Sequence, residues 1–174
     1  MEFVKDRYMY YVVQDTEFNR KYHNYKVGDF CDCSKKHNAK YVSYKKAKRK
    51  IFKTPREKKI VFMESLHEKV RKSINKQFPS RMQSIILYDN IEDCHKLIQK
   101  WNKNIGVGAL GLFRVKCDGK LHACATTPDN KKPVELTTKA HIEGITRFWK
   151  GDETAETKEY FFCGKAEIIE KIEL

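Results

Sequence analysis

Residues 156–169 read "ETKEYFFCGKAEII", two carboxylates leading into a run of strand-forming residues near the end of the chain. Aromatic and β-branched side chains of this kind favour a pleated, half-buried strand. The segment before it, residues 138–149, has the pattern of a helix. Because earlier strands and helices are arranged in the same interspersed way, the sequence predicts an α+β fold rather than a doubly wound parallel sheet.

The earlier strands and helices are indicated by periodicity. The segments "YMYYVV" and "MQSIILYD", residues 8–13 and 82–89, predict strands. Apolar residues spaced three and four apart predict a helix over residues 56–78. Asn90 is placed to cap a second helix over residues 91–101. Helices are therefore inserted between strands along the chain.

Glycines give the turn predictions. Asp118-Gly119 is a strong hairpin signal within "GALGLFRVKCDGKLHAC", so we expect two short strands there and a mostly antiparallel sheet. Gly28 marks a turn in the polar connection after the first strand, and Gly164 marks either a turn or a bulge in the last strand.

Length and composition predict one domain spanning residues 1–174, since 174 residues, 40% of them hydrophobic, can bury a core. No apolar run approaches the ~20 residues of a membrane helix, and the first residues lack the pattern of a signal peptide. The six cysteines are spread through the chain, unlike those of a disulfide scaffold. We therefore expect reduced thiols, a cytoplasmic location and no membrane partner.

Positive charge is concentrated in residues 35–59, which we call the basic segment. It holds twelve Lys and Arg residues against one acid, a net charge of +11 out of +13 for the whole chain. Such a block is either a solvated lysine-rich face or a site for a polyanion. Aromatic residues alternate with the cations, as in surfaces that bind nucleic acid, and the candidate phosphate contacts are Lys45, Lys46, Lys48, Arg49 and Lys50.

The order of these motifs resembles the ADP-ribosyltransferase-like superfamily, in particular its small bacterial and phage-related members. The resemblance rests on "YYVV", "FPSRMQSIILYD", a Trp-x-Gly helix end and "EYFFCGKAEII". It implies a split, mostly antiparallel pair of β-sheets with helices inserted between strands. It also implies NAD as co-substrate and transfer of ADP-ribose to an acceptor after cleavage of the nicotinamide glycosidic bond, which needs no metal.

The resemblance assigns the catalytic role to Glu159, the last acid before the strand "YFF". A fixed carboxylate stabilises the positive charge that builds on the ribose, as it does in glycoside hydrolysis. Relatives usually carry His or Arg on the first strand to hold NAD, whereas this chain has a pair of tyrosines. We expect Tyr11 to act in their place, with Arg7 and Gln14 as alternatives.

The motif "PSRMQS" supplies the other expected NAD contacts. The guanidinium of Arg81 suits the NAD diphosphate, because it can make two charge-assisted hydrogen bonds to phosphate oxygens. The hydroxyls available for the nicotinamide pocket are those of Ser80, Ser84 and Tyr88.

Two other hypotheses compete with this one. Cys31, Cys33 and His37 contain soft metal ligands, but Cys-x-Cys is not the usual zinc spacing and we expect no metal. The fold could also bind nucleic acid without turnover, or the acceptor could be protein. The charge of the basic segment favours RNA or DNA as acceptor. By analogy, such an enzyme would be a toxin of a toxin–antitoxin or anti-phage system, with an antitoxin protein as partner.

Overall fold

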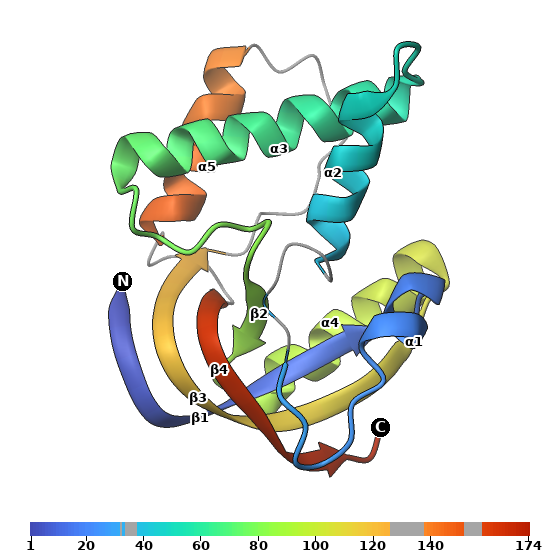
Figure 1. Ribbon diagram of the computed structural model, residues 1–174, viewed down its shortest axis with the longest axis vertical. Coiled ribbons are helices and arrows are strands. Elements are labelled where there is room, and N and C mark those ends of the chain that lie inside the picture. The colour runs from blue at the N-terminus through green and yellow to red at the C-terminus, as the bar shows by residue number, and fades with distance from the viewer. Residues whose placement is uncertain (32, 34–37, 126–137, 152–157) are drawn as a thin grey trace.

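A computed structural model describes residues 1–31, 33, 38–125, 138–151 and 158–174 (Figure 1). Four strands and five helices occur in these residues and confirm the α+β class. In chain order they are β1 (Glu2–Gln14), α1 (Glu17–Tyr22), α2 (Ala39–Arg49), α3 (Pro55–Ile74), β2 (Ile85–Tyr88), α4 (Ile91–Ile105), β3 (Ala109–Ala125), α5 (Thr138–Lys150) and β4 (Lys158–Ile172).

The four strands form one antiparallel sheet that closes on itself. β1 and β4 each pair with both β2 and β3, so every strand has two neighbours. β3 and β4 contain 17 and 15 residues and curve around the interior (Figure 1). The family resemblance implied a pair of sheets, whereas the described strands share a single closed sheet. The short β2 closes the ring through a few pairs, with Tyr10 and Tyr11 of β1 on one side and with Tyr160, Phe161 and Phe162 of β4 on the other.

Strand residues alternate between the inside of this closed sheet and its outer face. The inner side chains form an apolar core that includes Met9, Leu87, Val115, Phe162 and Ile168. Helix α4 packs over one part of the outer face, on residues such as Tyr88 and Leu112. Helices α3 and α5 pack over another part, on Cys124 and Phe161.

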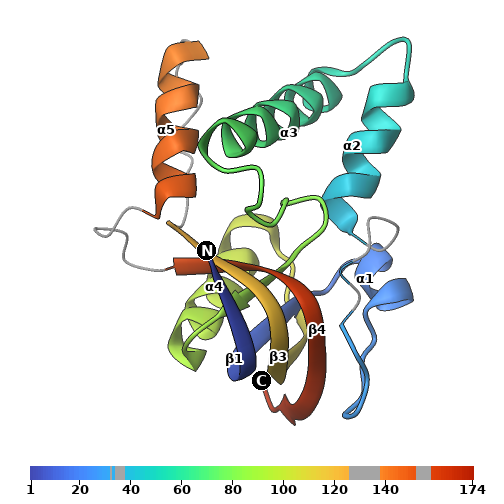
Figure 2. The same ribbon diagram turned by 60° about the vertical axis from the view of Figure 1, so that its left-hand side comes forward.

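The helices lie in two groups around the sheet. Figure 2 shows α2, α3 and α5 together beyond one end of the sheet, with α4 beside β1. Contacts join α2 to α3, α3 to α5, and α4 to β1 and β2. Among the described residues, no helix is both long enough and apolar enough to cross a membrane.

The expected hairpin at Asp118-Gly119 is wrong, because β3 continues through both residues without a break. Gly119 lies directly opposite Gly164 of β4. A Cβ on Gly119 would lie 2.6 Å from the carbonyl oxygen of Cys163, and one on Gly164 would lie 2.4 Å from that of Asp118. The two glycines therefore allow the two bent strands to approach each other closely. In the sequence, a glycine that marks a turn cannot be distinguished from one that marks such an approach.

The helices expected from periodicity are confirmed. The Asn90 side chain caps α4 by accepting a hydrogen bond of 2.8 Å from the backbone N–H of Asp93. The start of α3 is fixed by a capping box between Thr54, its N-cap, and Glu57 in its first turn, and the helix ends about one turn earlier than predicted. Helices α1 and α2 were not expected, because α1 is short with no buried residue, and α2 has five basic residues among eleven and buries only Ala47.

We predict that Gly164→Ala destabilises the protein by about 1–3 kcal/mol or more, the usual cost of overpacking a site that cannot expand. The matched control is Gly144→Ala on the exposed side of α5, where an added Cβ meets no atom within 4 Å. That control should stabilise α5 by up to ~1 kcal/mol, because alanine favours a helix. Urea unfolding of both variants measures the difference, and an unchanged Gly164→Ala variant would contradict the close strand approach.

Candidate functional site

Tyr10, Tyr88 and Glu159 lie side by side on the outer face of three neighbouring strands. Tyr10 of β1 lies opposite Tyr88 of β2. Leu87 of β2 lies opposite Tyr160 of β4, so in this antiparallel pair the next position places Tyr88 opposite Glu159. Burial raises the pKa of the Tyr88 hydroxyl, and the negative charge of the nearby Glu159 carboxylate raises it further. Burial raises the pKa of the Glu159 carboxyl above its usual value. This row of side chains is therefore partly withdrawn from water.

Arg81 lies in the loop between α3 and β2 and contacts α3. Its Nη1 lies 2.6 Å from Nε2 of His67, and its Nη2 lies 3.4 Å from the carboxylate of Glu64. The guanidinium carbon is 5.6 Å from the centre of the Phe148 ring. Only 14% of the Arg81 side chain is exposed, so its charge is weakly screened by solvent.

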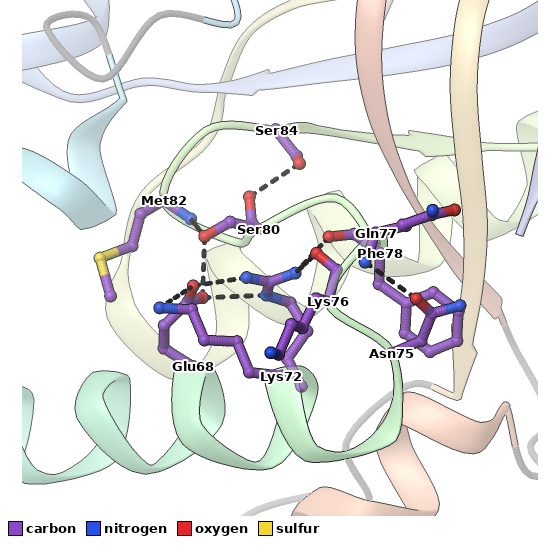
Figure 3. A network of polar contacts seen from close by, with 10 residues as sticks. Glu68, Lys72, Asn75, Lys76, Gln77, Phe78, Ser80, Met82 and Ser84 are labelled. Carbon is purple, nitrogen blue, oxygen red and sulfur yellow. Dashed lines mark hydrogen bonds and ion pairs between the residues drawn. The ribbon is translucent and has the colours of Figure 1, made fainter.

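A buried ion pair holds the loop that carries Arg81 against α3, and Figure 3 shows this network. Arg71 donates hydrogen bonds to the carbonyl oxygens of Lys76 and Phe78, at 2.9 and 2.5 Å. Its Nη2 also lies 2.6 Å from the carboxylate of Glu68. Because Arg71 is only 5% exposed, its unpaired charge would be costly, and the loop carbonyls help to satisfy it.

Ser80 and Ser84 shape this loop. The Ser80 hydroxyl donates to Glu68 at 3.0 Å, and the Ser84 hydroxyl donates to the carbonyl oxygen of Ser80 at 2.7 Å (Figure 3). Two of the three expected NAD-binding hydroxyls are thus already used as donors, that of Ser80 to α3 and that of Ser84 within the loop. Asn38, just before α2, donates to the carbonyl oxygens of Arg81 and Ser84 at 3.2 and 3.1 Å, which ties α2 to the loop.

Lys40, in the first turn of α2, is a second cation at this place. The positive charge of Arg81, together with burial, lowers the pKa of Lys40 to about 8, against the opposing effect of Glu64 and Glu159. Lys40 and Arg81 in turn limit the rise in the pKa of Glu159. These interactions bring together residues that we call the polar cluster: Lys40, Glu64, His67, Arg81, Tyr88 and Glu159.

Three buried atoms of the polar cluster have no hydrogen-bond partner in the described part of the chain: Glu64 Oε2, His67 Nδ1 and Arg81 Nε. Buried polar atoms are nearly always paired in folded proteins. His67 is 4% exposed, and burial with the nearby positive charges lowers its pKa to about 2, so its ring is neutral. Polar groups of the cluster, Arg81 Nε among them, are therefore left unsatisfied by the residues that the structure describes.

Tyr11, the expected first-strand contact, lies on the other face of the sheet. It is buried in the apolar core, where its ring centre lies 6.1 Å from that of Tyr25. The structure therefore does not bring Tyr11 to the polar cluster. Tyr10, its neighbour in the sequence, lies beside Tyr88 on the outer face.

The five basic residues expected to contact phosphate are exposed along α2 and at its C-cap. Two aromatic rings of this helix are covered by its own lysines. Nζ of Lys45 lies 5.9 Å from the Tyr41 ring, and Nζ of Lys48 lies 5.6 Å from the Tyr44 ring. The cations thus face solvent, whereas these two tyrosine rings do not offer a fully open face.

Comparison with known protein families matches residues 2–174 to DUF2441, described as a protein of unknown function. The chain belongs to the DUF2441 family. Comparison with curated proteins finds none that matches. The matched range includes both the polar cluster and α2 of this DUF2441 protein.

No motif in the sequence singled out Tyr10, Lys40, Glu64 or His67. His67 gave a usable signal, because a polar residue falls next to the apolar stripe of α3, between Leu66 and Val70. Lys40 gave none, since it is one of twelve similar cations in the basic segment.

Two sequence observations lie outside the described residues. His37 is one, so the structure describes only the two cysteines of the Cys31, Cys33 and His37 set, of which Cys31 is buried. Glu156, the first carboxylate of the closing segment, is the other.

We predict that His67 makes the protein less stable as the pH falls below about 6.5. The folded-state pKa of His67, about 2, is below its usual value of 6.5, so only the unfolded chain binds this proton between those limits. Stability is therefore lost as the pH decreases, by up to about 1.4 kcal/mol per pH unit. His67→Gln keeps an acceptor for Arg81 but cannot titrate, and should flatten this dependence.

The measurement is urea unfolding between about pH 7.5 and about pH 4.5. His95→Gln, on the exposed face of α4, is the matched control and should leave the pH dependence as in the wild type. A His67→Gln variant with the wild-type slope would show that His67 is not held neutral in the folded protein.

Proposed function

We propose that this DUF2441 protein is an NAD-dependent ADP-ribosyltransferase, a glycosyltransferase-class enzyme whose acceptor is nucleic acid. The observation that carries the proposal is the position of Glu159, a partly buried carboxylate that interacts electrostatically with Tyr88, Lys40 and Arg81. The motif resemblance assigns Glu159, Tyr88 and Arg81 to the site, and Glu159 is distant in the sequence from the other two. Their proximity in the polar cluster supports a common role.

The chemistry requires a fixed negative charge. In bound NAD, the bond between C1′ of the ribose and the nicotinamide nitrogen breaks, and nicotinamide leaves with the bonding electron pair. The Glu159 carboxylate faces the positive charge that develops on the ribose and lowers the barrier. The acceptor atom then bonds to C1′ of the ribose and loses its proton to solvent. A carboxylate in weakly screened surroundings acts more strongly than one in water.

The polar cluster also fits the other parts of NAD. Arg81 and Lys40 provide adjacent positive charges for the diphosphate, and Arg81 Nε has no partner among the described residues. The half-buried Tyr10 ring lies on the same face as Glu159, one strand beyond Tyr88, and is suited to packing against nicotinamide, whereas the Tyr88 ring is buried under α4. We assign no NAD contact to Ser80, Ser84 or Tyr11, because the loop and the core use them.

The acceptor follows from the position of α2. Its first turn carries Lys40 of the polar cluster, and its exposed face carries the cations of the basic segment. A polyanion bound along α2 therefore leads to the proposed reaction centre. We further propose, by analogy, that such an enzyme acts as a toxin in a toxin–antitoxin or anti-phage system and is restrained by an antitoxin protein.

A second candidate is a binding module of the same fold without turnover. It is favoured by Arg81, which already contacts His67 and Glu64, and by Tyr10 in place of a first-strand His or Arg. Release of nicotinamide from NAD by the purified protein distinguishes the two. Labelled NAD offered to RNA, DNA and cell protein in separate reactions identifies the acceptor, and labelled protein alone would replace nucleic acid in the proposal.

We predict that Glu159→Gln reduces nicotinamide release by about 100-fold or more, a typical effect of removing one group that stabilises transition-state charge. Glutamine keeps the size of the side chain and a polar contact for Tyr88, so folding and the Kd for NAD should remain close to wild type. Chromatography of released nicotinamide and calorimetric titration with NAD provide the two measurements.

Glu170→Gln on the exposed part of β4 is the matched control and should retain activity. The wild-type enzyme should also lose activity as the pH falls, because the ionised carboxylate is the active form. Since burial raises the pKa of Glu159 above 4.5, this loss should begin at a higher pH than for an exposed glutamate. Normal turnover in Glu159→Gln would reject the catalytic assignment.

We predict that replacing Lys45, Lys46, Lys48, Arg49 and Lys50 with Gln weakens nucleic-acid binding and flattens its dependence on salt. Each lost phosphate contact should reduce the gradient of log K against log salt by about 0.7 for single strands or about 0.9 for duplex DNA. Filter binding at several salt concentrations measures this. Cleavage of NAD without acceptor should continue, because these side chains are outside the polar cluster.

The control for that variant removes five positive charges outside α2, so that both variants have a net charge of +8. It changes these exposed lysines of α4, β3 and β4 to Gln: Lys96, Lys103, Lys120, Lys165 and Lys171. It should keep most of the salt dependence. Equal effects of the two variants would mean that overall charge, and not α2, attracts the nucleic acid.

A further inference from the structure

Two large apolar side chains are almost fully exposed at the end of α2. Ile51 is 90% exposed and Phe52 is 91% exposed, the highest fractions among the large apolar residues that the structure describes. They lie in the short connection between α2 and α3, which we call the tip. Exposure of an adjacent pair of this kind is unfavourable in water unless it serves binding.

The tip is held in place by polar contacts. Lys53 Nζ donates to the carbonyl oxygen of Lys50 at 2.6 Å, and Lys50 Nζ lies 2.5 Å from the Glu57 carboxylate. The backbone N–H of Thr54 donates to Glu57 at 3.0 Å within the capping box of α3. Both apolar side chains are therefore displayed on an organised connection, which reduces the entropy lost when they bind.

The charge around the tip indicates a polyanionic partner. The tip belongs to the basic segment, which carries a net charge of +11. Exposed cations continue from the tip along α2 in the direction of Lys40 and the polar cluster. A partner that complements this surface must carry repeated negative charges and also offer apolar faces to Ile51 and Phe52.

We infer that the tip binds single-stranded nucleic acid, with the Phe52 ring stacked on an unpaired base and Ile51 packed beside it. The inference deepens the proposed function and rests on its nucleic-acid acceptor. Bases of a single strand present open faces to aromatic rings, and the lysines of α2 neutralise the phosphates. Phe52 can stack in this way because its ring is open, unlike the lysine-covered rings of Tyr41 and Tyr44.

The length of α2 gives the size of the binding site. A helix of eleven residues is about 16 Å long at ~1.5 Å per residue. A strand with about 3.4 Å between nucleotides covers that length with roughly five nucleotides. One strand can then contact the tip and present another nucleotide near Glu159 for modification, without opening a duplex at the reaction centre.

An anionic membrane is the other partner with matching charge and apolar groups. Membrane insertion of the tip alone would involve two apolar side chains, and the cations of α2 would extend away from the bilayer. The continuation of charge towards the polar cluster favours a linear polyanion. Binding to anionic vesicles alone would therefore contradict the proposal.

The experiment uses fluorescence anisotropy with labelled single strands of RNA and of DNA, about twelve nucleotides long, and a blunt duplex of the same sequence. The test variant is Ile51→Ser with Phe52→Ser, which keeps every charge. The matched control is Ile105→Ser with Phe3→Ser, because Ile105 and Phe3 are also exposed, at 58% and 75%, outside the basic segment. Vesicles with and without phosphatidylserine form the parallel series.

The test variant should bind single strands more weakly by about five-fold to a hundred-fold, the range for losing one stacked base, with the salt gradient unchanged. The control variant should bind like wild type. Strands shorter than about five nucleotides should bind weakly. Phe52→Trp should keep the affinity and show quenching of its fluorescence by the stacked base.

Wild-type affinity in the test variant, equal or tighter binding of the duplex, binding of anionic vesicles alone, or no nucleic-acid binding would each overturn the inference. The assay contains no NAD, so its result is independent of the proposed reaction. Normal turnover in Glu159→Gln would reject the enzyme and leave the tip in place, whereas normal binding by the test variant would reject the tip and leave Glu159 in place.

Discussion

The close approach of Gly119 and Gly164 is the constraint on which the rest of the structure depends. With no Cβ between them, β3 and β4 run past one another without a turn and close the sheet with β1 and β2. Closure separates the strand residues into an inner apolar set and an outer set. The outer face is where Tyr10, Tyr88 and Glu159 meet, so the site is a consequence of how the sheet closes.

The polar cluster shows how a fold can hold charges that oppose its stability. Lys40 and Arg81 are adjacent cations, and His67 is kept neutral between them. The loop bearing Arg81 is fixed by the buried Arg71, whose own charge is satisfied by Glu68 and loop carbonyls. Among the described residues, buried polar atoms are left unpaired inside the cluster, whereas the buried Arg71 beside it is fully paired. This contrast is the arrangement expected of a functional site.

Much of the fold was predictable, because local chemistry determines its elements. Capping by Asn90 and the apolar stripe of α3 require only nearby residues, and both predictions are confirmed. The hairpin at Gly119 was wrong because a glycine signals either a turn or a close neighbour, and the neighbour is distant in the sequence. Helix α2 was not predicted because its sequence carries no apolar stripe, and Ala47 is its one buried residue.

The sequence by itself determined the α+β class, the charge of the basic segment, and the acid and arginine at positions 159 and 81, since composition and motifs are local properties. Only the tertiary structure decided which of two adjacent tyrosines lies on the same sheet face as Glu159. Side chains alternate between the two faces of a strand, but the strand pairing decides which set points outward. It also joined Lys40, Glu64 and His67 to Arg81. Burial and electrostatic coupling arise between elements, and no local pattern records them.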